Sequence, residues 1–270
     1  MTYIAPQTFR EWHPIGISKS INKQKPHAFN IGNLPMLLWF YNSNPNAMIN
    51  ICKHLGNRLD NSYIDNNCLV CPFHKQRYNQ SDNCGSIVES NGLYWWSYKS
   101  YQKKPFTLSS SPATKTYNYH IDINTDLLTF ILNFITMNDN YNDNHMYYHN
   151  KNKKQLFIKN KANRILYRYP YTIMVNNYRL SILPLKYTKL RIFITTYNPI
   201  TTILSYLYMI YVKYLFENEI GTSDLKNFFL FKKGMNDNNR YLETIYKSYD
   251  NYMFLTDFTV NQFMINRNFY

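Results

Sequence analysis

The chain has 270 residues, 45% of them hydrophobic, so it can form one large domain or two small ones with a buried core. Its formal net charge is +14, which favours acidic partners: a redox protein first, then a nucleic acid or an anionic membrane face. The basic residues are dispersed except around 151–154, a cluster typical of a solvated loop, so no specific nucleic-acid site is predicted.

The N-terminal segment, Met1–Gly16, lacks the apolar core of a signal peptide. The sequence therefore predicts a cytoplasmic protein whose four cysteines stay reduced and serve metal or redox chemistry rather than disulfides. The one candidate for a membrane span, Ile200–Phe216, is interrupted by Lys213 and is shorter than the roughly 20 apolar residues that a span needs. We expect a buried helix there and no stable span.

The first part of the chain has the pattern of a small β domain. Between residues 12 and 112, short apolar runs alternate with turn residues, and the part ends in a Ser/Pro stretch at Ser109–Pro112. This pattern predicts an all-β domain of antiparallel sheets over residues 1–112. The expected strands lie in the segments 29–33, 36–51 and 90–96.

The second part, residues 113–270, mixes helical and strand patterns. Thr125–Ile135 has helical spacing, with Asn124 or Thr125 as the N-cap. The runs 164–175, 178–185 and 190–197 are typical of strands, and 200–216 and the residues from Asp224 onward are typical of helices. The expected helical face of the first helix consists of Leu127, Leu128, Ile131, Leu132 and Ile135. The predicted fold class is α+β with a mostly antiparallel sheet.

Two short segments each supply one thiolate and one imidazole. The first contains Cys52 and His54 in the sequence CKHLG, and the second contains Cys71 and His74 in CPFH. A Rieske cluster binds one of its two irons through two cysteines and the other through two histidines. In an extended segment residues i and i+2 point the same way, so each segment can aim both ligands at one cluster. Gly56 permits a tight turn after the first pair.

A zinc site is the competing interpretation. It would use Cys52, Cys68 and Cys71 with His74 or Cys84, because Cys68 and Cys71 form a C-x-x-C pair. A zinc ribbon needs two such pairs and this chain has one, so the [2Fe-2S] interpretation is preferred. Cys68 and Cys84 are then expected to be buried thiols.

The segments WHPIG, CKHLGNRLD and CPFHKQRYN resemble the Rieske domain of the Rieske non-haem iron oxygenases over about residues 10–100. The family usually has Arg after the first His and Gly-Trp after the second, where this chain has Leu55 and Lys75-Gln76. Cytochrome bc-type Rieske proteins carry an extra cysteine in each loop, and here those places hold Asn57 and Phe73. The resemblance therefore implies the oxygenase branch.

A second metal site is predicted in the segment DNYNDNHMYYH. His145 and His149 are four residues apart, which on a helix places both imidazoles on one face. Two histidines and a carboxylate form the facial triad of non-haem Fe(II) oxygenases, and Asp257 could supply the carboxylate. The resemblance implies that Asp143 bridges the two metal centres, although the family spaces the bridging Asp and the two histidines one residue further apart. The alternative is a solvent-exposed pair of histidines.

The resemblance implies an oxidoreductase with a Rieske [2Fe-2S] cluster and a mononuclear Fe2+ that oxidises an apolar organic substrate with O2. Its catalytic domain would be a reduced, helix-grip-like sheet and helix over residues 113–270, its electron donor a reductase or ferredoxin, and its assembly a homotrimer. The alternative is a Rieske ferredoxin-like electron-transfer protein with a degenerate C-terminal domain.

Overall fold

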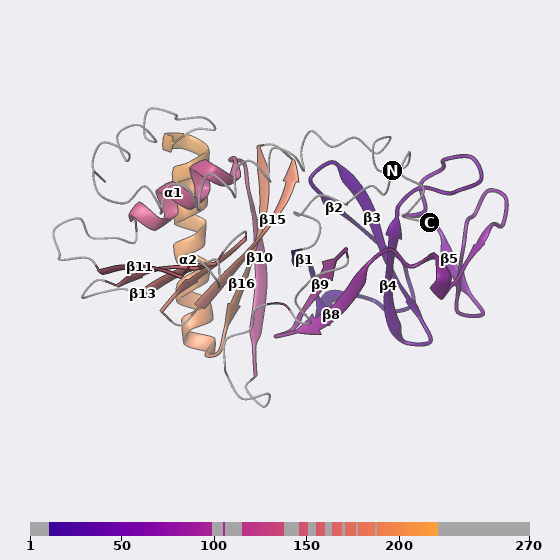
Figure 1. The fold of residues 1–270 in the computed structure, drawn as a ribbon, viewed down its shortest axis with the longest axis horizontal. Coiled ribbons are helices and arrows are strands. Elements are labelled where there is room, and N and C mark those ends of the chain that lie inside the picture. The colour runs from indigo at the N-terminus through magenta and orange to yellow at the C-terminus, as the bar shows by residue number, and fades with distance from the viewer. Residues whose placement is uncertain are drawn as a thin grey trace. The chain divides into compact units, whose positions relative to one another are not determined.

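The computed structural model describes residues 11–98, 105, 115–137, 146–150, 155–159, 164–168, 171–176, 178–186 and 188–220. The chain divides into two compact units; the described residues up to 105 belong to the first unit and those from 115 to 220 belong to the second. Figure 1 colours the described residues by their position in the chain, from indigo at the start of the first unit to orange at the end of the second.

Within the described residues, the first unit contains three small antiparallel sheets. Two short 3-10 turns, Ser18–Ser20 and Gln80–Asp82, lie between strands. The sheets contain, in spatial order, β1 (His13–Ile17), β9 (Leu93–Ser97) and β8 (Ser86–Ser90); β2 (His27–Ile31), β3 (Leu34–Tyr41) and β4 (Asn44–Ile49); and β5 (Tyr63–Asp65), β6 (Cys68–Val70) and β7 (Arg77–Tyr78). This is the antiparallel β architecture that the sequence predicted.

The β3–β4 hairpin is the central pair of the first unit. Its turn residues, Asn42 and Ser43, both have positive φ angles of 48° and 65°, as a two-residue hairpin turn with the twist of the strands requires. β3 is apolar along its length and almost all of it is buried, which is the pattern of a strand covered on both sides. The hairpin therefore gives the rest of the unit a rigid support.

A buried cluster connects this hairpin to the third sheet. Apolar side chains of β3 and β4 pack against those of β6 and β7 and against two cysteines, and Ile64 of β5 packs at the side. Dense packing of this kind fixes side-chain positions, so the segments between these strands start from well-defined ends. The members are Leu37, Trp39, Met48, Cys52, Leu59, Leu69, Cys71 and Tyr78.

The second unit is built on one seven-stranded sheet in which all described strand pairs are antiparallel. This arrangement and the helices beside it confirm the predicted α+β class. The spatial order is β10 (Tyr117–Ile123), β16 (Lys189–Thr196), β15 (Tyr178–Lys186), β14 (Thr172–Val175), β13 (Arg164–Arg168), β12 (Gln155–Lys159) and β11 (Met146–Asn150).

The first helix, α1 (Leu127–Met137), begins two residues later than the sequence predicted. Its N-terminal cap is Asp126, whose Oδ1 accepts a hydrogen bond from the Thr129 N–H at 2.9 Å, and not Asn124 or Thr125. A carboxylate suits this place because it also faces the positive end of the helix dipole. Among the side chains that the structure describes, Leu127, Phe130, Ile131, Phe134 and Ile135 are buried, so phenylalanines contribute to this face beside three predicted residues. The side chains of the other two predicted residues, Leu128 and Leu132, lie outside the described part.

The second helix, α2 (Pro199–Leu215), begins and ends one residue earlier than the sequence predicted. The expectation of a buried helix is wrong, because only the side with Ser205, Met209 and Val212 is buried and the other side is exposed. Asn198 caps it by accepting a hydrogen bond from the Ile200 N–H at 2.8 Å, and Pro199 occupies the first turn, where no N–H is needed. The helix runs across the sheet in Figure 1 and packs against β10 and β16. A π-turn, η4 (Phe216–Ile220), follows it. None of the described helices is long and apolar enough to cross a membrane.

An ion pair joins the two strands under α2. Arg191 of β16 donates two hydrogen bonds to the Asp122 carboxylate of β10, at 2.7 and 2.9 Å. Burial raises the pKa of Asp122, but the hydrogen bonds and charge of Arg191 outweigh burial and hold that pKa below its ordinary value. The pair is therefore an electrostatic contribution to the stability of the second unit.

Candidate metal centre

The four predicted cluster residues lie in two loops of the first unit. Loop 1 is Cys52–Asn57, which follows β4, and loop 2 is Cys71–Gln76, which joins β6 to β7. In the β6–β7 hairpin Leu69 pairs with Tyr78 and Val70 with Arg77, so the hairpin closes directly beneath loop 2. Both loops thus start from strands of the buried cluster described above.

The two loops have the same backbone hydrogen bonds. In loop 1 the Cys52 N–H donates to Asn57 O at 2.7 Å, and the Gly56 N–H donates to Cys52 O at 2.8 Å. In loop 2 the Cys71 N–H donates to Gln76 O at 2.9 Å, and the Lys75 N–H donates to Cys71 O at 3.1 Å. Each cysteine is therefore held by residues four and five positions later, so both cysteines begin the same kind of turn.

The fourth residue after each cysteine adopts a left-handed backbone. Gly56 has a φ of 73°, which glycine accepts without cost, whereas Lys75 has a φ of 60°, which strains a residue with a Cβ. The Lys75 ammonium lies over the Tyr63 ring, 5.3 Å from its centroid, a cation–π contact that contributes to holding the lysine there. Lys75 is the position where the oxygenases that the sequence resembles usually have Gly.

The cysteines are buried and the histidines are exposed. Cys52 is 2% exposed and Cys71 is fully buried, while the His54 and His74 rings lie at the surface. The two imidazoles meet edge to face, with their ring centroids 4.8 Å apart. The structure therefore brings all four predicted ligand residues together, with the thiols on the inner side and the imidazoles on the outer side.

The surroundings of Cys52 favour an anionic sulfur. Burial raises the pKa of this thiol, but hydrogen bonds from the Tyr78 hydroxyl, the backbone of His54 and Leu55 and the Cys71 thiol outweigh burial and lower the pKa below its ordinary value. The interaction with Cys71 also places the two sulfurs next to each other. A thiolate is the form of cysteine that binds metal.

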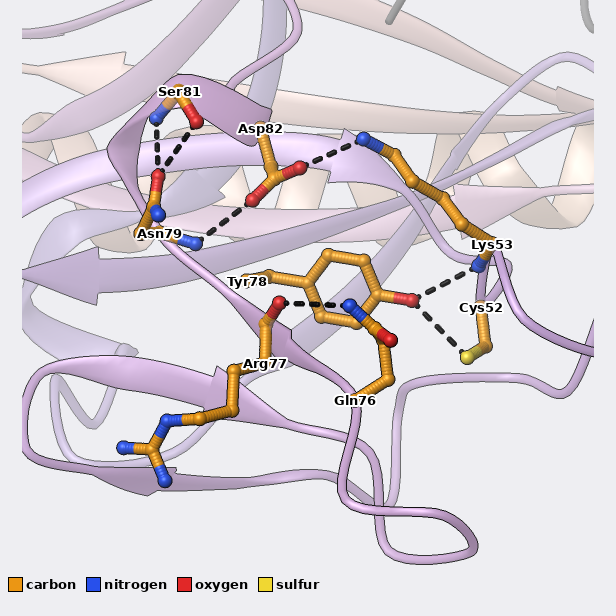
Figure 2. Close-up of polar contacts among 8 residues, drawn as sticks. All are labelled: Cys52, Lys53, Gln76, Arg77, Tyr78, Asn79, Ser81 and Asp82. Atoms are coloured by element: carbon orange, nitrogen blue, oxygen red, sulfur yellow. Dashed lines mark hydrogen bonds and ion pairs between the residues drawn. The ribbon is translucent and has the colours of Figure 1, made fainter.

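Tyr78 is the residue at this site that sequence reasoning missed. Figure 2 shows its hydroxyl between two groups of loop 1: it donates to the Cys52 sulfur at 3.1 Å and accepts from the Lys53 N–H at 2.9 Å. Burial, together with the neighbouring sulfur of Cys52, raises the pKa of Tyr78, so the phenol stays protonated and remains a donor. Its position four residues after His74, in a strand that leads back under loop 1, is the only sequence signal.

A second contact ties loop 1 to the chain after β7. The Lys53 ammonium lies 2.7 Å from Asp82, and Asp82 in turn accepts a hydrogen bond from the Asn79 N–H at 2.9 Å (Figure 2). Asn79 caps the turn Gln80–Asp82 through its side chain, which accepts from the Ser81 N–H at 2.8 Å. These contacts fix the residue between Cys52 and His54.

The zinc interpretation does not match the positions of its residues. Among the residues that the structure describes, no three His, Cys, Asp or Glu side chains could hold a single metal ion. Cys68 is only half-buried, contrary to the prediction, and interacts with Arg77. Cys84 is buried as predicted, and burial raises its pKa to about 12, so it is a protonated thiol. None of the four cysteines forms a disulfide.

The donor set does fit a Rieske cluster. Such a cluster takes two thiolates on one iron and two imidazoles on the other, so no more than two protein ligands surround either ion. Two adjacent buried sulfurs and two adjacent exposed imidazoles have this composition, and the donors around Cys52 are of the kind that hold and tune a cluster sulfur.

The predicted mononuclear iron site falls mostly outside the described residues. Asp143, His145 and Asp257 lie there, and of the set only the backbone of His149 is described. His149 belongs to strand β11, where it pairs with Leu156 of β12, and not to a helix. The prediction of a helical histidine pair is therefore wrong at this residue, because Met146–Asn150 forms the strand at the end of the antiparallel sheet and pairs with β12.

Comparisons with known proteins agree with the geometry of the first unit. Residues 11–97 match the Rieske [2Fe-2S] domain. The chain is 30% identical over 79 residues to the oxygenase component of 3-ketosteroid-9-alpha-monooxygenase from Rhodococcus rhodochrous, a match that covers 29% of this chain and 21% of that protein. It is 31% identical over 90 residues to the anthranilate 1,2-dioxygenase ferredoxin subunit from Burkholderia cepacia, covering 32% of this chain and 83% of that subunit.

A solved structure extends the likeness in fold beyond the first unit. Dicamba monooxygenase bound to 3,6-dichlorosalicylic acid superposes with a TM-score of 0.62 at 10% identity, covering 96% of this chain and 100% of that chain. The sequence match to the steroid monooxygenase component spans only about a fifth of that protein's length. Taken with the paired Cys and His of the two loops, these matches show that the chain belongs to the family of Rieske [2Fe-2S] domain proteins, with that domain at residues 11–97.

Proposed function

We propose that the chain is a Rieske-type oxygenase, in which residues 1–112 hold a [2Fe-2S] cluster and residues 113–270 form a catalytic domain. The observation that carries this proposal is the pair of matching loops, each presenting one buried Cys and one exposed His. Cys52 and Cys71 would bind one iron and His54 and His74 the other. When bound, the cluster supplies a centre that accepts and releases one electron.

The protein groups around the cluster have two roles. Tyr78 donates to the Cys52 sulfur and thereby favours negative charge at the inner end. His54 and His74 lie at the surface, so the imidazole end is where electrons would enter and leave. The net charge of +14 favours an acidic reductase or ferredoxin as the donor.

The second part of the proposal is a mononuclear Fe2+ with His145, His149 and Asp257 as its candidate ligands. Because His149 lies in strand β11, this ligand set rests on the resemblance to the oxygenases and not on a shared helical face. Two imidazoles and one carboxylate leave positions open for dioxygen, and the iron would supply the oxidation chemistry. The likeness in fold to dicamba monooxygenase over most of the chain supports a catalytic domain of this type. The steroid monooxygenase relative supports an apolar organic substrate.

A homotrimer would connect the two centres. In the family that the sequence resembles, an Asp accepts hydrogen bonds from a cluster His of one subunit and an iron-binding His of its neighbour. By position these residues would be Asp143, His74 of the adjacent subunit and His145. A carboxylate suits this role because it can accept from two imidazole N–H groups at once.

The second candidate function is electron transfer without oxygenation. It is favoured by the ferredoxin subunit of anthranilate 1,2-dioxygenase, 83% of whose length matches a 90-residue part of this chain. In such a carrier the residues of the second unit would bind no iron.

Metal analysis separates the two functions. The chain would be purified without oxygen and its iron and acid-labile sulfide counted per chain. The oxygenase predicts about three irons and the carrier about two, each with about two sulfides. About two irons in a protein with a full Rieske EPR signal would remove the oxygenase proposal and leave the carrier.

A further inference from the structure

The two metal loops are closed at their bases by different groups. Loop 2 lies between β6 and β7, and these strands pair directly beneath it, Val70 with Arg77. Loop 1 follows β4, which ends at Ile49, and the next strand, β5, begins only at Tyr63. Residues 50–62 are all described and contain no strand, so the base of loop 1 lacks the strand pairing that closes loop 2.

The side chain of Asn50 takes the place of that pairing. Its Oδ1 accepts a hydrogen bond from the Leu59 N–H at 2.8 Å, which joins the chain before loop 1 to the chain after it. Inside this contact the Cys52 N–H donates to Asn57 O at 2.7 Å. Two successive contacts across a loop are what a β hairpin provides, and here a side-chain carbonyl supplies one of the acceptors.

Both partners of this contact are fixed in the first unit. The Asn50 N–H donates to Pro35 O of β3 at 2.9 Å, and Asn50 is only 1% exposed. Leu59 is fully buried and belongs to the buried cluster beneath the loops. A buried N–H that loses its acceptor has no water to replace it, so this hydrogen bond is costly to break. Asn50 therefore ties loop 1 to the β3–β4 hairpin.

An amide suits this position better than a carboxylate or an apolar group. While Oδ1 of Asn50 accepts from Leu59, its Nδ2 donates to the Asp60 Oδ1 at 3.4 Å. Arg58 also donates to the Asp60 carboxylate, and this hydrogen bond outweighs burial and holds the pKa of Asp60 below its ordinary value. Asp60 is thus an acceptor, and a side-chain amide both donates and accepts at one end, as this position requires.

We propose that Asn50 is a positioning residue for the cluster: its amide closes the base of loop 1 and so fixes Cys52 and His54 against the ligands of loop 2. The His54 and His74 rings, 4.8 Å apart, come from separate loops, so their geometry depends on how each loop is held. This role rests on the proposed [2Fe-2S] cluster, which both candidate functions share, and not on the mononuclear iron.

Asn50→Ala in the full chain, purified without oxygen, tests this role. The change removes the acceptor of the Leu59 N–H and adds neither bulk nor charge. Hydrogen exchange of loop 1 peptides, followed by mass spectrometry, should rise about tenfold or more, while exchange of loop 2 peptides stays unchanged. We expect shifted g values in the reduced EPR spectrum, an altered coupling from one imidazole nitrogen, and faster loss of the cluster.

The matched control is Asn46→Ala. Asn46 is also buried, at 2% exposed, and its amide donates to Asn44 O at 2.9 Å within the β3–β4 hairpin. This change should lower the stability of the first unit and leave the EPR spectrum as it is in the wild type.

A rescue exchanges the two polar groups. In Asn50→Asp combined with Asp60→Asn, the carboxylate at position 50 can accept from both the Leu59 N–H and the amide at position 60. The wild-type spectrum should therefore return. Asn50→Asp alone places two carboxylates side by side and should keep the altered spectrum.

A wild-type spectrum and cluster lifetime in Asn50→Ala would overturn the positioning role. So would the same spectral change in Asn46→Ala, because the cause would then be a general loss of stability. If Asn50→Ala does not fold, Asn50→Asp and the double variant decide, and equal spectra from these two would overturn the role. A wild-type protein without a Rieske spectrum would instead remove the cluster assignment, and the role with it, so the two failures are distinguishable.

Discussion

Replacing Tyr78 with Phe tests whether this residue sets the properties of the cluster. The change removes the hydroxyl that donates to the Cys52 sulfur at 3.1 Å and keeps the ring, which is 1% exposed in the buried cluster beneath the loops. The packing of the first unit should therefore survive. The Lys53 N–H loses its acceptor as well, and this costs about 1 kcal/mol of stability.

The size of the effect on potential follows from the hydrogen bond. A hydrogen bond to a charged group contributes about 1.5–3 kcal/mol, and the donor stabilises the reduced cluster more than the oxidised one because reduction adds negative charge. If about 1 kcal/mol of this energy differs between the two states, the potential falls by about 40 mV, since about 1.4 kcal/mol corresponds to about 59 mV for one electron.

A redox titration monitored by EPR measures this shift. The expected result for Tyr78→Phe is a potential about 40 mV lower, with the Rieske-type spectrum retained. The matched control is Tyr63→Phe, because Tyr63 is 43% exposed and contacts loop 2 through Lys75. A Tyr78→Phe protein with the wild-type potential would refute the assignment of this hydroxyl to a cluster sulfur.

Four further changes have definite expected outcomes. His74→Cys should shift the reduced EPR spectrum toward the all-cysteine ferredoxin type and lower the potential, and an unchanged spectrum would remove His74 from the ligands. Lys75→Gly should relieve the left-handed backbone and raise stability to urea by about 1 kcal/mol, whereas a loss would show that the cation–π contact dominates. Arg191→Met should lower the urea midpoint at pH 7. Because the pKa of Asp122 is depressed in the folded state, that difference should vanish as the pH falls through it, and a difference that persists below about pH 2 would contradict the ion-pair explanation. Asp143→Asn should keep iron content but collapse substrate turnover, and normal turnover would end its proposed bridging role.

The sequence was sufficient to find the two loops that carry the candidate ligands, because the pattern within each loop is local. Cys52 and His54 are separated by one residue, and Cys71 and His74 by two, so the joint presentation of each pair depends on a short stretch of backbone. The left-handed Gly56 was likewise visible as a glycine in a turn. Strand patterns such as β3 were clear for the same reason, because a continuous apolar run is a local property.

The features that the sequence missed depend on distant residues. The Tyr78 hydroxyl meets Cys52 from 26 residues away, and only the register of the β6–β7 hairpin decides that it points there. His149 was placed on a helix from its spacing to His145, but pairing with β12 made it part of a strand. Helix α1 begins later than predicted because Asp126 is its N-cap. Asn124, Thr125 and Asp126 are all capable of capping a helix, and the sequence alone does not show which of them does so.

Pulsed EPR of the reduced wild-type protein tests whether His54 and His74 both bind one iron of the cluster. We expect hyperfine coupling from two imidazole nitrogens on a spectrum of the Rieske type, with one of the two couplings lost in His54→Cys. A reduced cluster without nitrogen coupling, or with both couplings intact in His54→Cys, would contradict it.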